Sequence, residues 1–165
     1  PASAPNEVEL PYPMQIGSGT FDTNLALTYL GQTDQISWGG QLRAILRFGE
    51  NDRDFRYGNR QNLTGWFAVK AADWLSFSTR LEALVVGEID GADPNLNPMM
   101  VITADTANSG GNFLNGGLGF NVYIPKGALK NLRFGFEFAT PLYQDVNGIQ
   151  LKQKETLTFG TQYAF

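Results

Sequence analysis

The sequence predicts an all-β protein that belongs to the class of antiparallel up-and-down transmembrane β-barrels. Apolar and polar residues alternate with a period of two along nearly the whole chain, and no segment shows a helical period. The last segment is the clearest example, because Leu157, Phe159, Tyr163 and Phe165 alternate with polar residues up to the final aromatic. Such alternation is expected where one strand face meets lipid and the other a lumen.

Composition agrees with strands that have one wet face. Charged residues make up 17% of the 165 residues and hydrophobic ones 42%, while the mean hydropathy is -0.21. The sequence contains no run of about 18 apolar residues, so it predicts no transmembrane helix. A soluble β-sandwich or lipocalin-like barrel also alternates apolar and polar positions, so it remains an alternative.

Several function classes are disfavoured by residues that are scarce or missing. The chain has neither Cys nor His, which removes disulfides, thiolate ligands and the commonest general base. The sequence therefore predicts no enzyme activity, no cofactor and no metal. The acidic loops around Asp52 and Asp93 lack the spacing of an EF-hand and are interpreted as surface loops. A net charge of -4 argues against a nucleic-acid partner.

About seven strands are expected. They begin near Phe21, Ile36, Leu63, Leu75, Leu114, Leu132 and Ile149. The facing of residues 63–71 stays open because Trp66 and Phe67 are adjacent. The strand that begins at Leu75 is expected to continue through Ile89.

The connections tend to alternate between tight and long, which predicts an orientation. Bacterial barrels place short turns on the periplasmic side and long loops outside. With a periplasmic C-terminus, the first strand descends, so the extended, loop-like residues 1–19 lie outside and residues 20–165 form the strands of one domain. Because single-chain bacterial barrels have an even strand number, we expect the chain to be the C-terminal part of a larger barrel.

Charged residues on the wet faces are the candidate functional residues. They line a lumen and set ion selectivity, or they form salt bridges that fill a narrow barrel. These lumen-lining candidates are Arg43, Arg47, Arg80, Glu82, Glu88, Arg133, Glu137, Lys152 and Lys154. Aromatic residues near strand ends are expected at the two membrane interfaces. They are Trp38, Phe48, Trp74, Tyr143, Tyr163 and Phe165.

Several segments resemble one outer-membrane family, which is associated with phenol meta-pathway degradation clusters and whose members are often called transporters. They read PYPMQIGSGTFD (11–22), LTYLGQ (27–32), SWGGQ (37–41), RFGEND (47–52), DWLSFSTRL (73–81), EIDGADPNLNP (88–98) and ETLTFGTQYAF (155–165). In that family the PYPMQ-type segment lies near the middle of the chain. The resemblance implies an outer-membrane location, transport or channel activity, no catalytic residue and further strands upstream.

The expected function is thus a bacterial outer-membrane channel or transporter for small solutes. Expected partners are outer-membrane lipid, a small-molecule solute, and the barrel-assembly machinery through the C-terminal strand that ends at Phe165. A plugged structural barrel, in which the loop 90–112 binds a partner, is the first alternative. A soluble β-barrel or sandwich binding protein is the second.

Overall fold

The computed structural model of the protein describes residues 10–164. Seven strands form one sheet in the order β1-β2-β4-β5-β7-β8-β9, and every neighbouring pair is antiparallel. The strands are β1 (Phe21–Gln32), β2 (Ile36–Phe48), β4 (Arg60–Ala72), β5 (Leu75–Val86), β7 (Gly111–Tyr123), β8 (Leu132–Val146) and β9 (Thr156–Tyr163). Two short strands, β3 (Phe55–Arg56) and β6 (Asp90–Gly91), pair with each other.

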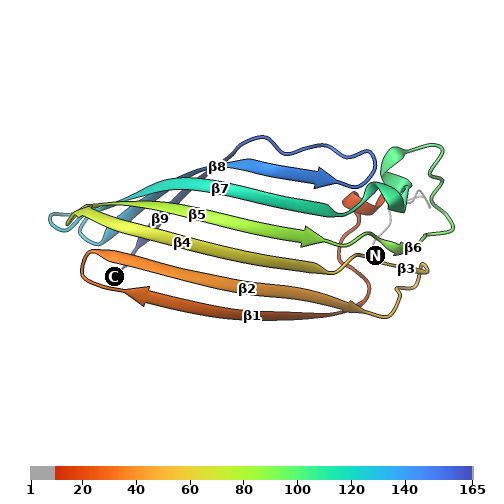
Figure 1. Ribbon diagram of the computed structural model, residues 1–165, viewed down its shortest axis with the longest axis horizontal. Helices are drawn as coiled ribbons and strands as arrows, with labels where there is room; N and C mark the ends of the chain where they lie inside the picture. The colour runs from red at the N-terminus through yellow and green to blue at the C-terminus, as the bar shows by residue number, and fades with distance from the viewer. Residues whose placement is uncertain (1–9, 165) are drawn as a thin grey trace.

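The seven-stranded sheet curls into a half-barrel, which confirms the predicted antiparallel β-barrel architecture in its partial form (Figure 1). The turns 33–35, 73–74 and 124–131 lie at one end. The opposite end carries the longer segments 49–59, 87–110 and 147–155, together with three 3-10 turns, η1 (Tyr12–Met14), η2 (Ile102–Ala104) and η3 (Thr106–Asn108). No helix between residues 10 and 164 has the length and apolar character needed to cross a membrane.

The strand register resolves the facing of residues 63–71. Trp66 lies opposite Gly39 and Arg80, which places it on the concave face, whereas Phe67 lies opposite Trp38 and is on the convex face. The Trp66 ring covers Gly39 so closely that an added Cβ there would lie 2.3 Å from a ring carbon. A side chain at position 39 would therefore displace the indole.

The convex face is apolar and exposed. Leu27, Leu118 and Leu157 are 74%, 67% and 68% exposed, and they belong to strands on both edges and in the middle of the sheet. In β4 the convex positions are exposed and most concave ones half-buried, in strict alternation from Asn62 to Val69. The apolar side chains of the convex face are therefore not buried by other parts of the described chain, and such a large exposed apolar surface is unusual for a protein in water.

Charged residues of the seven strands show the opposite distribution. By register, they all lie on the concave face except Asp145, which is on the convex side near the long-loop end of β8. The concave residues are Asp22, Arg43, Arg47, Arg60, Lys70, Arg80, Glu82, Arg133 and Glu137. The half-barrel thus has one apolar surface and one charged surface.

Several strand ends differ from those expected, and β4 and β7 begin earlier, at Arg60 and Gly111. β5 ends at Val86, before Ile89, because Gly87 turns toward the neighbouring loop and donates its N–H to the Asn59 carbonyl at 2.8 Å. β8 continues to Val146 and β9 begins only at Thr156, so the connection after β8 is a long loop and not a short turn. This correction makes tight and long connections alternate more regularly than the sequence predicted.

β8 contains a bulge where its register with β7 shifts by one residue. Asn115 lies opposite Pro141 and Leu114 opposite Tyr143, so Leu142 is the extra residue. Proline lacks an N–H for the ladder, and a bulge is a position where strands tolerate it. The strand continues beyond it because the pairing with β7 resumes.

Three segments at the long-loop end fold together into a small domain-like cap. We call residues 10–20, 49–59 and 87–110 the loop cap. Its centre is Phe55, which is fully buried and makes edge-on ring contacts with Tyr12 at 4.8 Å and Tyr57 at 5.4 Å between centroids. The Tyr57 hydroxyl donates to the Tyr12 carbonyl at 2.7 Å. The loops therefore have their own aromatic core.

Buried polar residues hold the cap segments in place. The Asn51 side chain accepts from the N–H of Arg53 and donates to the Ser18 carbonyl, so it links two segments. Asp93 is buried, receives an N–H from Asn95, and pairs with Arg53 at 3.5 Å. These side chains, from the two acidic loops of the sequence, are turn-forming and loop-linking residues.

The cap gives two tyrosines a distinct response to pH. Burial raises the pKa of Tyr12 and Tyr57, and the Asp93 and Asp105 carboxylates add to the effect at Tyr12, although a hydrogen bond from the Asp93 N–H opposes it. Because the folded cap holds both phenols in the neutral form, their contribution to its stability is complete below an unfolded pKa of about 10 and is lost as pH rises through the higher folded values.

We therefore expect alkaline titration, followed by phenolate absorbance, to show two late ionisations in the folded protein. Tyr57→Phe should remove one of them. The denatured wild type and variant provide the baseline, because the shifts vanish on unfolding. An unchanged set of late ionisations in the variant would contradict the assignment.

Candidate functional site

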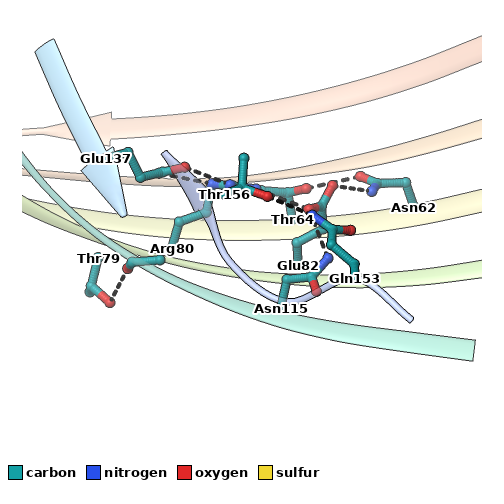
Figure 2. Close-up of polar contacts among 10 residues, drawn as sticks. Asn62, Thr64, Thr79, Arg80, Glu82, Asn115, Glu137, Gln153 and Thr156 are labelled. Atoms are coloured by element: carbon teal, nitrogen blue, oxygen red, sulfur yellow. Dashed lines mark hydrogen bonds and ion pairs between the residues drawn. The ribbon is translucent and has the colours of Figure 1, made fainter. Parts of the chain in front are cut away.

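The concave face carries a charged network at mid-height, with Arg80 of β5 at its centre. The Arg80 guanidinium binds Glu137 of β8 through both carboxylate oxygens, at 3.0 and 2.6 Å. Its remaining terminal nitrogen lies 3.1 Å from Glu82 Oε2. Figure 2 shows Arg80 and Glu82 of β5 and Glu137 of β8 pointing toward one another. A forked guanidinium is suited to bidentate pairing with a carboxylate.

Two amides complete the network around Glu82. Asn62 of β4 donates to Glu82 Oε1 at 2.6 Å, and Asn115 of β7 lies 3.5 Å from Oε2 (Figure 2). Asn62 in turn accepts from the Thr64 hydroxyl at 2.9 Å. The network therefore ties four consecutive strands together from the inside.

A glycine makes the Arg80 pair possible. β7 lies between β5 and β8, and Gly117 is the β7 residue opposite both Arg80 and Ala139. A Cβ at position 117 would lie 3.2 Å from the carboxyl carbon of Glu137. The ion pair thus crosses over a strand at a position where that strand has no side chain.

A second set of polar contacts joins β1 and β2 along the concave face. Arg47 Nε pairs with Asp22 at 3.2 Å, Arg43 Nε donates to Asn24 Oδ1 at 3.0 Å, and Gln41 donates to the Thr28 hydroxyl at 2.8 Å. Arg47 also donates to the Gly58 carbonyl and lies over the Tyr57 ring at 5.9 Å. Arg47 therefore connects the wall to the loop cap.

The concave face is hollowed at its two ends. The larger hollow, about 620 Å³, lies at the short-turn end and is lined by Lys70, Trp74, Tyr123, Arg133 and Gln162 among others. Arg133 is placed over the Tyr123 ring at 5.2 Å, and Lys70 pairs with Asp73 at 2.7 Å. A smaller hollow of about 340 Å³ lies toward the long-loop end.

The charged candidates from the sequence fall into two groups. Arg43, Arg47, Arg80, Glu82, Arg133 and Glu137 lie on the concave face of the half-barrel. Glu88 follows the end of β5, while Lys152 and Lys154 lie in the loop before β9. The sequence placed these last three on strands because it extended β5 and β9 too far.

Most of the aromatic candidates lie near the two ends of the strands. Phe48 and Tyr143 are on the convex face near the long-loop end. Trp38 and Tyr163 are on the same face near the short-turn end, and Trp74 is in the turn between β4 and β5. Phe165 lies outside the described residues.

Two concave cations, Arg60 and Lys70, were missed by the sequence reasoning, as was the amide of Asn62. Arg60 and Asn62 lie before Leu63, where the strand was expected to begin, and Lys70 lies in the segment 63–71, whose facing stayed open. Pairing Trp66 with a small residue on the neighbouring strand would have been the signal that fixed this facing. The loop cap gave no such signal, since its contacting residues are far apart in sequence.

The chemistry of the concave face is that of binding polar or charged groups. Guanidinium, carboxylate, amide and hydroxyl groups line the smaller hollow. In the part of the chain that the structure describes, no three His, Cys, Asp or Glu side chains gather closely enough to hold a metal ion. No protein-family model and no curated protein sequence matches this chain.

Because the Arg80–Glu137 ion pair crosses β7 at Gly117, the stability of the protein should be sensitive to a larger residue at this position. Gly117→Val should destabilise the folded protein by about 1–3 kcal/mol, because the new side chain displaces the Glu137 carboxylate from Arg80. The measurement is urea unfolding of the folded protein and its variant.

Gly160→Val is the matched control, because a Cβ at Gly160 meets no atom within 4 Å. The cost at position 117 should also shrink when Glu137 is already replaced by Ala. Equal costs at positions 117 and 160 would show that the crossing does not constrain the sheet.

Proposed function

We propose that this chain forms part of the wall of a bacterial outer-membrane β-barrel that passes small solutes. The separation of apolar and charged residues between the two sheet faces carries the proposal. In a bilayer, lipid contacts the apolar convex face and shields it from water, and the charged concave face borders an aqueous lumen. A soluble barrel would place its apolar residues inside.

Strand length supports the same proposal. A strand rises about 3.3 Å per residue, and roughly ten residues at a tilt near 45° cross the bilayer core. The continuous strand β4 has 13 residues and its partner β5 has 12. Aromatic side chains near both strand ends match the girdles of membrane barrels.

The edges of the sheet constrain how such a barrel closes. Within the described residues, β1 and β9 each have one partner, and both run toward the short-turn end. A lipid-exposed open edge does not occur in a bilayer core, because its backbone groups would lack hydrogen-bond partners. An antiparallel barrel that contains these seven strands therefore needs an odd number of further strands.

A plugged barrel is the rival function. The loop cap has a fully buried Phe55 and cross-linked segments, so it is a built structure at the mouth of the half-barrel. A rigid cap would suit a barrel whose loops bind a partner and whose lumen is closed.

The lipid-facing role predicts a difference between neighbouring residues. Leu27→Arg puts a charge on the convex face and should cost about 2–4 kcal/mol of stability in lipid, the range known for arginine at the bilayer midplane. Thr28→Arg, the matched control on the concave face, should cost far less. Unfolding of each variant from lipid vesicles provides the measurement, and equal costs would argue for a soluble protein.

Transport predicts conductance. The full-length protein in planar bilayers should give discrete single-channel currents, and liposomes that contain it should swell in small sugars. Heat-dependent gel mobility checks that the barrel is folded. A folded barrel that gives neither currents nor swelling would favour the plugged alternative.

A further inference from the structure

The concave face is richer in positive charge than the chain as a whole. The formal net charge of the chain is -4, yet the concave cations Arg43, Arg47, Arg60, Lys70, Arg80 and Arg133 outnumber the concave carboxylates Asp22, Glu82 and Glu137. Most of the other acidic residues lie in turns and loops. The net charge of the whole chain is therefore opposite in sign to the formal charge of the concave face.

The concave carboxylates are already paired. Asp22 binds Arg47, while Glu82 and Glu137 both bind Arg80. Arg43, Arg60 and Arg133 have no carboxylate partner among residues 10–164, and of these Arg133 lies over the Tyr123 ring at 5.2 Å. Arg43 donates from its Nε to the neutral amide of Asn24, and its two terminal nitrogens have no hydrogen-bond acceptor among residues 10–164. Two forked donors therefore remain available to an external acceptor.

These two arginines share one hollow. Arg43 of β2 lies opposite Asn62, and Arg60 of β4 lies opposite Ile45, so the arginines are diagonal neighbours on the same face. Such neighbours lie about 7–8 Å apart at their backbones, within reach of one ligand for side chains as long as arginine. Both line the 340 Å³ hollow with Gln41, Asn62 and Thr64, which add amide and hydroxyl groups.

The carboxylate that also borders this hollow does not neutralise them. Glu82 Oε1 accepts from Asn62, and Oε2 accepts from Arg80, with Asn115 at 3.5 Å. Its charge is thus directed toward Arg80. The lining of the hollow thus has two guanidinium groups against one carboxylate, which is a formal charge of +1.

We propose that the hollow between Arg43 and Arg60 binds a small dianionic solute with carboxylate or phosphate oxygens. Guanidinium groups recognise these oxygens in pairs, and two of them side by side match two negative charges. Arginines that line a pore also favour anions over cations. The binding site depends only on the geometry of the hollow, whereas its role in selecting the solute rests on the proposed channel function.

Binding is tested by calorimetric titration of the full-length protein in detergent with succinate and, separately, with inorganic phosphate. The wild type should bind at least one of the two, and the variant Arg43→Gln/Arg60→Gln should bind it at least about tenfold more weakly, since each lost charge-assisted contact is worth about that much. The anion that binds more tightly identifies which oxygen group the hollow prefers.

Arg56→Gln is the matched control. Arg56 belongs to the loop cap and pairs with Asp90 at 2.6 Å, so the same chemical change there should leave affinity unchanged. Arg43→Lys/Arg60→Lys, which keeps the charge but not the fork, should bind with intermediate affinity. No binding by the wild type of either anion, or equal affinity in the Gln variant, would overturn the proposal.

Reversal potentials in a KCl gradient then test selectivity. The wild-type channel should favour chloride, and the Gln variant should shift toward K⁺. If no conductance is found, the channel function fails while the binding titration still decides the site. If the Gln variant conducts with an unchanged reversal potential, the hollow does not select the permeating ion.

Discussion

The antiparallel pairing of all seven strands in the order β1-β2-β4-β5-β7-β8-β9 is the constraint on which every other feature depends. Backbone pairing fixes the register, and a strand has only two faces, so each side chain is assigned to the convex or the concave surface. A slip of one residue would exchange the two surfaces. The position of Trp66 over Gly39, with Phe67 on the opposite face, shows how strongly the neighbouring strands impose this choice.

Once the faces are fixed, the partners of each charged side chain are set by the polar groups close to it on the same face. Arg80 reaches two carboxylates, because Gly117 leaves the path across β7 open. Arg43 reaches only an amide, and Arg60 makes no ion pair between residues 10 and 164. The concave face therefore has a band of paired charges at mid-height, where Arg80 meets Glu82 and Glu137, and a hollow toward the long-loop end that Arg43 and Arg60 line. The paired charges hold strands together, whereas the hollow can bind a solute.

The loop cap shows a different principle from the sheet. The half-barrel has no central apolar core of its own, whereas the cap buries Phe55 between Tyr12 and Tyr57 and satisfies its polar groups with Asn51 and Asp93. Arg47 contacts both parts, through Asp22 in the wall and Tyr57 in the cap. The mouth of the half-barrel is thus a packed structure joined to the strand that carries Arg43.

The sequence by itself determined the fold class, the number of long strands and the face of most residues, because a period of two is a local property that neighbouring residues carry. It also placed Arg80, Glu82 and Glu137 on one surface. Tertiary structure alone decided the facing of β4, the ends of β5 and β9, the crossing of Arg80 over Gly117 and the core around Phe55. Each of these depends on residues distant in sequence, and no local pattern encodes which distant side chain will fill, cover or neutralise a position.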